Sequence, residues 1–353
     1  MRKYSRKYKD FLIRKSKQGN SSKGHPKKRK IPIVPNRSVT PQRVKKRAQS
    51  VVQTGAISYK VTPVRLIAPD DLRLTYSECE NVTGFIHRIK SASRSSRNII
   101  VDLENVSKIC DGTISMLLSV IKEIGRDGVR VKGTYPKDID ARNFLEKSGF
   151  FGHIRGHVSP SNGETKNTII RTGDSRTPPA EVSQEIYNSM ETVWGTKGRN
   201  PLLRGGVFEM VRNSCDHAFS NSASVFWHFS LSHHEDEELV SYSFVDNGKG
   251  IIRTMSSKGI IDKIFDYFKS NSNILKAAFE NGIESATGLP WRGKGLPTIY
   301  ELYEDKVVTN LIVVSNNVFI DFDRNLRKEI KFPFSGTYYH WVINPSCKKY
   351  CFN

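Results

Sequence analysis

The chain has 353 residues, of which 37% are hydrophobic, and its formal net charge is +21. This length accommodates two domains, or one domain with large additions, around a sizeable core. No segment approaches the roughly 18 apolar residues that a membrane span needs, and no apolar signal-peptide region follows the basic start. The five cysteines are scattered and odd in number, which predicts reduced thiols, no zinc site and a cytoplasmic location.

The positive charge is concentrated in residues 1–50, which hold 18 Lys or Arg and a single acid, Asp10. The segment includes the runs KKRK at 27–30 and KKR at 45–47 and contains few apolar residues. Such a composition cannot bury enough surface to offset the entropy lost on ordering, so we expect a disordered tail. Lys and Arg bind phosphate backbones with release of counterions, which predicts contact with DNA, RNA or another polyanion. A membrane surface, an acidic protein or no specific ligand are the alternatives.

Residues 51–155 are predicted to form a small α/β domain, because runs with strand character alternate with a helical spacing of apolar residues. Residues 51–69 alternate loosely and indicate one or two strands. The elements expected after them are a strand at 98–106, a helix at 114–125, a strand at 129–135 and a helix at 138–150.

The sequence VDLENVSKICDGT at 101–113 resembles STAS domains, the fold of anti-sigma-factor antagonists, and the resemblance covers about residues 60–155. In those regulators, a Ser or Thr directly after the acid is phosphorylated. Here Gly112 follows Asp111, and Thr113 comes one position later. The resemblance therefore favours a STAS-like domain that docks a protein partner or dimerises over one that works as a phosphorylation switch.

Residues 156–180 are rich in Ser, Gly, Thr, Asn and Pro and predict a linker, or a pair of hairpin strands with long turns. The second domain is expected to span residues 181–353 and to open with a helix at 181–194. Another helix should follow, because Asn200 is a favourable N-cap and Pro201 a favourable first helical residue.

Three polar residues of this second helix share one face. Glu209, Asn213 and Asp216 are spaced i, i+4 and i+7. An amide flanked by two carboxylates can hold hydrated Mg²⁺, which prefers oxygen ligands, and a carboxylate beside it can orient an attacking water. Taken alone, however, such a triplet more often forms a solvated helix face.

Two strand-like runs, at 222–232 and 238–246, follow this helix. Between them, His233 and His234 precede the acidic run EDEE and are interpreted as part of the connecting turn. The second run ends in the sequence DNGKGI at 246–251, whose glycines permit a close turn.

The rest of the chain is predicted to contain helices at 259–269 and 273–281, then a glycine-rich stretch before a further helix. Gly293, Lys294 and Gly295 occupy that stretch. Glycines let the backbone approach a phosphate chain, and a helix N-terminus offers it free N–H groups. The last expected elements are strands at 306–315, 317–323 and 336–344.

Four sequence boxes in this order resemble the GHKL (Bergerat-fold) ATPase superfamily, which includes DNA gyrase, MutL mismatch-repair proteins, the ninety-kilodalton heat-shock chaperones and histidine kinases. The first box, EMVRNSCDHA, is most similar to gyrase and MutL, and the resemblance covers about residues 180–345. It implies a two-layer α/β sandwich, with a mixed, mainly antiparallel sheet under helices. The boxes are E-x3-N-x2-D-x-A (Glu209, Asn213, Asp216, Ala218), D-x-G-x-G (Asp246, Gly248, Gly250), G-x-G-L (Gly293, Gly295, Leu296) and Gly-Thr (Gly336, Thr337).

The resemblance implies a role for each polar residue of these boxes. Glu209 resembles the general base that orients the hydrolytic water, and Asn213 resembles the Mg²⁺ ligand. Asp216 matches the acid that supports the pocket. Asp246 resembles the acid that accepts a hydrogen bond from the adenine amino group, a contact that guanine cannot make because it presents a carbonyl there.

The remaining box residues would shape the pocket. Gly248 and Gly250 would let the turn pass close to the base, and Thr337 would close the adenine pocket from the last strand. A mobile lid over the phosphates would comprise Gly293, Lys294, Gly295 and Leu296.

These features together predict an ATP-binding protein, with ATP and Mg²⁺ as cofactors, that acts as a regulatory switch. Gyrase and MutL carry a further domain that supplies a catalytic Lys, whereas this chain ends soon after the Gly-Thr strand, so we expect slow or partner-activated hydrolysis. The alternatives are a serine/threonine kinase of the anti-sigma type and a non-catalytic nucleic-acid-binding module. A histidine kinase is disfavoured, because nothing resembles its phosphoacceptor helix pair. Homodimerisation stays open.

Overall fold

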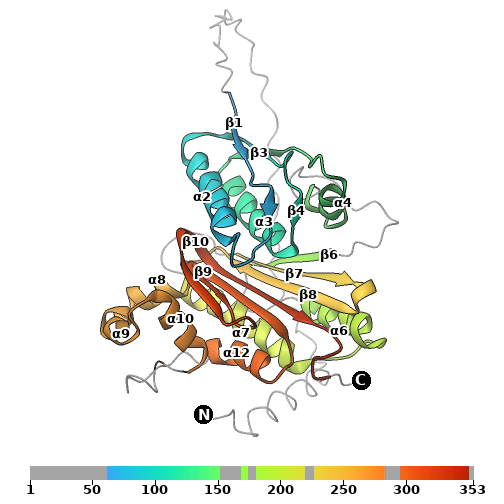
Figure 1. Ribbon diagram of the computed structural model, residues 1–353, viewed down its shortest axis with the longest axis vertical. Coiled ribbons are helices and arrows are strands. Elements are labelled where there is room, and N and C mark those ends of the chain that lie inside the picture. Colours follow the sequence, from blue (N-terminus) through green and yellow to red (C-terminus); the bar gives the residue numbers. More distant parts are fainter. Residues whose placement is uncertain are drawn as a thin grey trace, which may run out of the picture.

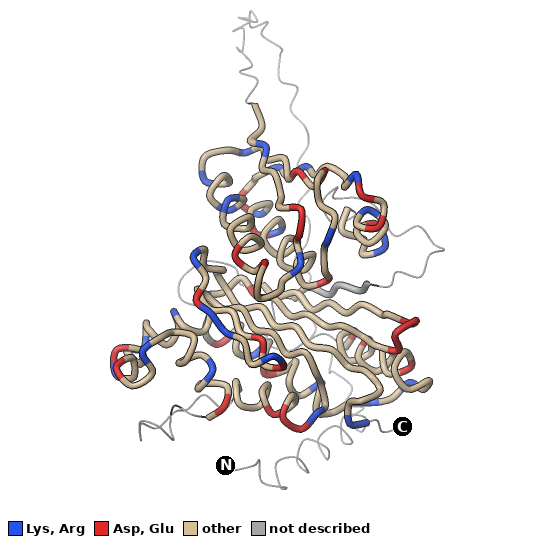
Figure 2. Tube along the Cα trace, viewed as in Figure 1, with Lys and Arg blue, Asp and Glu red and all other residues tan. Residues whose placement is uncertain are grey.

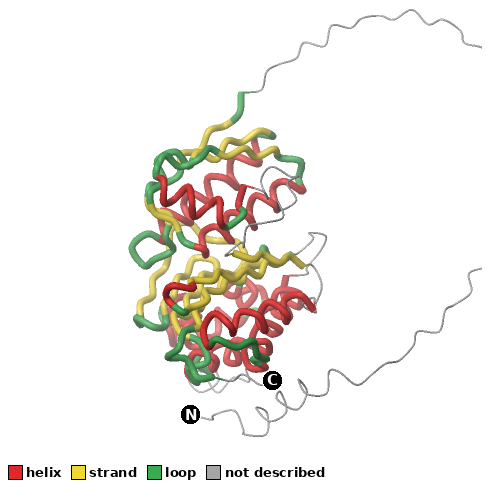
Figure 3. The backbone as a smooth tube through the Cα atoms, turned by 90° about the vertical axis from the view of Figure 1, so that its right-hand side faces the viewer, coloured by secondary structure: helices red, strands yellow, loops and turns green. Residues whose placement is uncertain are grey.

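The computed structural model shows four stacked layers of secondary structure. A small sheet lies at one end, followed by two helices, a larger sheet and a second set of helices (Figures 1 and 3). Among the residues that the structure describes, no helix has both the length and the apolar composition to cross a bilayer. The described residues are 62–151, 168–173, 180–218, 226–281, 283 and 295–349, so the predicted basic tail lies outside them.

The N-terminal unit contains three parallel strands in the order β1-β3-β5. Parallel neighbours need a crossover connection, which is usually a helix, and here α2 and α3 provide the two crossovers. A two-stranded parallel ladder and the short helix α4 complete the unit. Its elements are β1 (Val64–Ile67), β2 (Asp71–Leu72), α2 (Cys79–Ser95), β3 (Asn98–Asp102), β4 (Lys108–Ile109), α3 (Asp111–Arg126), β5 (Arg130–Gly133) and α4 (Ile139–Lys147).

The C-terminal unit contains five strands in the order β6-β7-β8-β10-β9, antiparallel at every pairing. Helices cover one face of this sheet, which confirms the predicted two-layer α/β sandwich. Its strands are β6 (Thr168–Gly173), β7 (Trp227–His234), β8 (Leu239–Asp246), β9 (Thr309–Asp321) and β10 (Leu326–Ile343). Its α-helices are α6 (Ala180–Trp194), α7 (Pro201–Ala218), α8 (Ile251–Ser257), α9 (Ile260–Phe268), α10 (Asn271–Phe279) and α12 (Gly295–Glu304).

The alternating sequence of β7 explains how this sheet buries both faces. Trp227, Phe229 and Leu231 point to one side and join the core formed with α6, α7, α10 and α12. The intervening residues of β7 point to the other side, because successive strand residues face opposite ways. There α2 and α3 of the N-terminal unit cover the sheet, and residues of both units share a second core.

The structure differs from the sequence-based expectations at several elements. Residues 168–173, placed in the linker, form β6 at the edge of the large sheet. His233 and His234 are the last residues of β7, not part of the turn, because the short 3-10 helix Glu235–Glu237 makes the connection. The strands expected at 306–315 and 317–323 are the single strand β9, which passes through Asn316 at a φ of 54° with an irregular register against β10.

Helix α2 has no counterpart among the predicted elements. Its sequence contains Gly, Thr and several Ser residues, which are poor or neutral helix formers. The signal that identifies it is the apolar spacing of Val82, Phe85, Ile86 and Ile89, all of them buried.

Candidate nucleotide-binding site

Asp246 ends β8 with a buried carboxylate that three protein donors hold in place. Its Oδ1 accepts hydrogen bonds from the Gly248 amide at 2.8 Å and the Thr337 amide at 3.2 Å. Its Oδ2 accepts from the Ser214 hydroxyl of α7 at 3.0 Å. The carboxylate is therefore fixed by the turn after β8, by β10 and by α7 at once.

The pKa of Asp246 is raised to about 6, because burial penalises the charged form more than the three hydrogen bonds favour it. The folded protein thus binds this proton more tightly than the unfolded chain does. The contribution of Asp246 to stability is present at about pH 4 and is lost as the pH rises through about 6. At neutral pH the group is a desolvated carboxylate with acceptor capacity left for a further donor.

Gly336 brings β10 against the backbone of Asp246. Its φ is +105°, which side chains rarely adopt. A Cβ atom on Gly336 would lie 2.0 Å from the Asp246 carbonyl oxygen, so glycine is required on both counts. This close approach places the Thr337 amide within reach of the carboxylate.

The turn between β8 and α8 is tied to the neighbouring strand β9. Gly250 precedes α8 at a φ of +79°, and a Cβ atom there would lie 2.5 Å from the Asn316 amide oxygen. The Asn316 side chain accepts from the Arg253 amide at 3.0 Å and donates to the Lys249 carbonyl at 2.7 Å. The Ile251 amide donates to Ser315 Oγ at 2.8 Å. Gly250 of the predicted box therefore permits a turn that hydrogen bonds with Ser315 and Asn316 of β9 hold in place.

Glu209 and Asn213 form the second part of the site. They lie about one turn apart on α7. Glu209 Oε2 and Asn213 Nδ2 are buried without a hydrogen-bond partner among the described residues. A Cβ atom on Gly295, the first residue of α12, would lie 2.8 Å from Asn213 Oδ1 and 3.1 Å from Glu209 Oε2. A buried polar group without a partner costs about 1–3 kcal/mol, which makes this pair a candidate for contact with a ligand.

Asp216 has a different environment from Glu209 and Asn213. Its side chain is 36% exposed and lies 3.8 Å from the Arg212 guanidinium, which also lies 3.4 Å from Glu209. The contact from α7 to Asp246 is made by Ser214, which was not among the predicted site residues. A serine directly after Asn213, inside a box already assigned to the site, was the available signal.

The other predicted site residues divide between the described and undescribed parts of the chain. Gly295 and Leu296 begin α12 and are both buried. Gly293 and Lys294 lie outside the described residues, as does the side chain of Ala218.

The residues present fit a nucleotide with its magnesium ion better than they fit a metal held by protein alone. Among the described residues, no group of three or more His, Cys, Asp or Glu is placed to hold a metal ion. Mg²⁺ in nucleotide sites usually keeps several waters and takes one or two protein oxygens together with phosphate oxygens. The Asn213 amide oxygen, which packs so close to Gly295 that a Cβ atom there would lie 2.8 Å away, would provide one such oxygen.

Comparisons with known proteins add one distant likeness. No protein-family model matches the sequence, and no curated protein matches it. Among solved structures, the histidine kinase domain of a blue-light activated histidine kinase from Erythrobacter litoralis EL346 is similar over 75% of this chain and 94% of that chain. The sequence identity is 15% and the TM-score is 0.24. At that TM-score the likeness carries no weight for fold or function, which leaves the site geometry as the basis for assigning a function.

Proposed function

We propose that the protein binds ATP with Mg²⁺ in its C-terminal sandwich and that binding serves as a regulatory switch. The observation that supports this most is the unpaired, buried pair Glu209 Oε2 and Asn213 Nδ2 next to Gly295. The next residue of the same helix, Ser214, contacts the buried carboxylate of Asp246. Helix α7 thus carries groups suited to both ends of one elongated ligand.

At the base end, Asp246 would accept a hydrogen bond from the adenine amino group. Its carboxylate is held by three donors and is kept from water, so its direction is set before the ligand arrives. Guanine has a carbonyl at the corresponding position, and two acceptors facing each other in a buried site leave both unpaired. Adenine selectivity follows from this mismatch.

At the phosphate end, Asn213 would hold the magnesium ion through its amide oxygen, and Lys294 would contact the phosphates. The ion would neutralise phosphate charge, as it does generally in phosphoryl transfer. Glu209 lies beside Asn213 with one oxygen unpaired, and that oxygen would orient a water for attack. The Arg212 guanidinium, 3.4 Å from the other oxygen, would hold the Glu209 side chain in place.

The binding proposal is tested by calorimetric titration of ATP and GTP, with Mg²⁺, into wild-type protein and Asp246→Asn. The exposed α4 residue Asp140 provides the matched control, Asp140→Asn. We expect ATP binding in the wild type and the control, no comparable GTP binding, and loss of ATP binding in Asp246→Asn. Equal ATP affinity in the wild type and Asp246→Asn would remove Asp246 as the adenine contact.

The fate of the terminal phosphate separates hydrolysis from the kinase alternative. Incubation with γ-labelled ATP should release free phosphate, and Glu209→Gln should keep ATP binding while losing that release. Label on the protein would instead support a kinase. Thr113 is a poor internal substrate, because it is fully buried and its hydroxyl donates to the Leu72 carbonyl.

Binding of nucleic acid through residues 1–50 remains a prediction from the sequence. Deleting these residues should lower any affinity for DNA or RNA and flatten its dependence on salt, because fewer counterions are released. Fluorescence anisotropy with a labelled duplex at 50 and 200 mM salt measures both quantities. An unchanged salt slope would show that the tail does not contact the phosphate backbone.

A further inference from the structure

The face of the large sheet opposite α7 has an unusual composition for a buried surface. Strands β7 and β8 carry no Lys, Arg or Glu, and Asp246 is their one acid (Figure 2). On the side that α3 covers, they nevertheless present mainly Ser and His, at His228, Ser230 and Ser232 of β7 and Ser241 and Ser243 of β8. A polar face of an antiparallel sheet is normally the one that meets solvent. This polar part of the face adjoins an apolar part, formed by Val314 and Phe319 of β9 and Tyr338 of β10, and the N-terminal unit covers both.

Asp111, the first residue of α3, is the centre of the contact between the two units. Its Oδ1 accepts from Ser232 Oγ at 2.7 Å, and its Oδ2 accepts from Ser241 Oγ at 2.8 Å and from His234 Nε2 at 3.3 Å. One turn later, Ser115 Oγ lies 2.6 Å from Ser230 Oγ. The carboxylate also benefits from its place at a helix N-terminus. Every one of these hydrogen bonds joins the N-terminal unit to the sheet.

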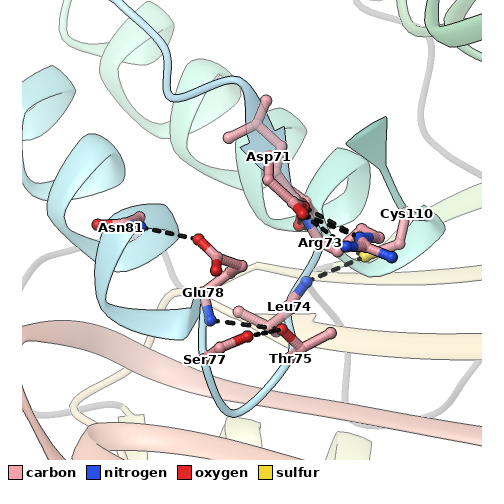
Figure 4. A network of polar contacts seen from close by, with 10 residues as sticks. Asp71, Arg73, Leu74, Thr75, Ser77, Glu78, Asn81 and Cys110 are labelled. Atoms are coloured by element: carbon pink, nitrogen blue, oxygen red, sulfur yellow. Dashed lines mark hydrogen bonds and ion pairs between the residues drawn. The ribbon is translucent and has the colours of Figure 1, made fainter. Parts of the chain in front are cut away.

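The start of α3 packs closely against the sheet on one side and is hydrogen-bonded to its own N-terminal unit on the other. A Cβ atom on Gly112 would lie 1.9 Å from the Tyr338 hydroxyl of β10, so only glycine fits at this distance. On the other side, the Cys110 thiol accepts from the Leu74 amide at 3.4 Å, next to the Arg73–Asp71 ion pair (Figure 4). The N-terminal unit thus presents Asp111 from a position fixed by its own contacts.

The cluster of Asp111, His234, Ser232 and Ser241 does not have the geometry of a hydrolytic triad. In a triad, one ring nitrogen of the histidine faces the carboxylate and the other faces the serine. Here the same nitrogen, His234 Nε2, lies 3.3 Å from Asp111 and 3.2 Å from Ser241. The arrangement links two units and does not activate a hydroxyl.

We propose that Asp111, His234, Ser232 and Ser241 form a pH-sensitive latch that holds the N-terminal unit reversibly on the large sheet. The latch is closed when His234 is protonated and Asp111 is ionised, and it weakens when His234 loses its proton. Release uncovers the serines of β7 and β8 together with the apolar residues that β9 and β10 contribute to the shared core. It leaves the helix-covered core on the other face of the sheet intact. The proposal is independent of ATP binding.

The pKa directions of the two groups set the pH range of the latch. The hydrogen bond and charge of Asp111 raise the pKa of His234 above its usual value of 6.5. Despite burial, the hydrogen bonds from His234, Ser232 and Ser241 lower the pKa of Asp111 below 3.8. The stabilisation from His234 is complete below pH 6.5 and is lost as the pH rises through its higher docked pKa, whereas that from Asp111 is lost only in strong acid.

Other titratable groups face the cluster from each packed element. They do not share the behaviour of His234: burial lowers the pKa of His340 on β10, so that side chain is neutral over the same range. Burial also raises the pKa of the Tyr338 hydroxyl well above 10. The remaining neighbours are Glu237 after β7, whose charge supports protonation of His234, and the Cys110 thiol before α3.

Cys79 provides a native probe of docking. It begins α2, is fully buried in the core that the two units share, and lies near Lys328 of β10. Cys215 is equally buried, but it belongs to the core on the other side of the sheet. Of these two thiols, undocking exposes only Cys79, whereas global unfolding exposes both Cys79 and Cys215.

The experiment measures alkylation of Cys79 in the full chain at pH 6 and pH 8, by peptide mass spectrometry, in wild type, His234→Gln and His233→Gln. Comparing each variant with wild type at the same pH removes the effect of pH on thiol reactivity. His233 is the matched control, because it is adjacent in sequence but bonds Thr192 on the opposite face. We expect His234→Gln to label Cys79 faster than wild type at pH 6 and about equally at pH 8, with His233→Gln equal to wild type at both.

The change in the rate of Cys79 labelling should match the pKa of His234, which is measured separately. Histidine titration by NMR gives the pKa of His234 in wild type and in Asp111→Asn, and each unit of difference should produce about a tenfold change in the labelling ratio at pH 6. A variant-to-wild-type ratio that is the same at pH 6 and pH 8 overturns the latch. So does labelling of Cys215 in parallel with Cys79.

Discussion

Two aspartates that pack against opposite faces of one sheet have pKa values shifted in opposite directions. Asp246 accepts from two amides and a hydroxyl, and burial raises its pKa to about 6. Asp111 accepts from two hydroxyls and an imidazole, and its pKa is lowered. The difference shows that burial alone does not set the charge of a carboxylate, since a neighbour able to carry a positive charge reverses the outcome. Asp111 has a partner inside the protein that can carry a positive charge, whereas Asp246 has three neutral donors and acceptor capacity left for one more donor.

The largest effect is expected where the backbone itself shapes the Asp246 centre. Gly336→Ala places a Cβ atom 2.0 Å from the Asp246 carbonyl oxygen at a φ of +105°, so we expect a loss of about 2–4 kcal/mol in the free energy of unfolding. Gly128→Ala is the matched control, because its φ is +81° with nothing within 4 Å, and it isolates the cost of the backbone conformation. Urea denaturation measures both. Equal losses would mean that the contact with Asp246 is easily relieved.

A smaller loss is expected at the Asp111 centre. Gly112→Ala directs a methyl group into the Tyr338 hydroxyl and should cost about 1–3 kcal/mol by overpacking. Gly125→Ala, in the same helix with nothing within 4 Å, should instead be neutral or stabilising by up to about 1 kcal/mol. Adding Tyr338→Phe should recover part of the loss only in the Gly112 variant. Without such recovery, the close packing of α3 on β10 would not be the cause.

Replacing each aspartate by asparagine tests the contrast directly. Asp111→Asn should lower the free energy of unfolding at pH 6 by about 1–2 kcal/mol, because a charge-assisted contact with His234 is lost. Asp246→Asn should be neutral or stabilising at pH 7, because a desolvated charge is removed. Thermal denaturation of each variant at pH 6 and pH 7 shows whether its free energy of unfolding falls or rises relative to wild type. Destabilisation of the same size in both variants would erase the distinction between the centres.

The smallest effect is the pH dependence of ligand binding. Protonation of Asp246 turns an acceptor into a donor that faces the adenine amino group, so ATP affinity should fall as the pH drops below about 6. The expected decline is up to about tenfold between pH 6 and pH 5. ATP titrations at constant ionic strength measure it. An affinity that is level from pH 7 to pH 5 would place the titration of Asp246 below that range.

Much of the C-terminal unit was predictable because its signals are local. Alternation in β7 and β8, the cap at Asn200 and the spacing of Glu209 and Asn213 all act within a few residues. The Asn200 side chain does accept from the Leu203 amide, at 3.0 Å. Ser214 lies inside an assigned box, but its contact is with Asp246 at the end of β8, and a pattern within the helix does not reveal that partner.

The sequence by itself determined the types of the expected helices and of β7 and β8, the two faces of these strands and the clustering of polar residues into boxes, but not α2 or β6. These follow from periodicity, which depends only on neighbouring residues. Only the tertiary structure decided what covers each face. The serines of β7 and β8 have the pattern of a solvated surface, and His233 and His234 have that of a turn. The pairing of Ser232, Ser241 and His234 depends on Asp111, more than a hundred residues earlier in the chain. No local pattern encodes a contact over that separation.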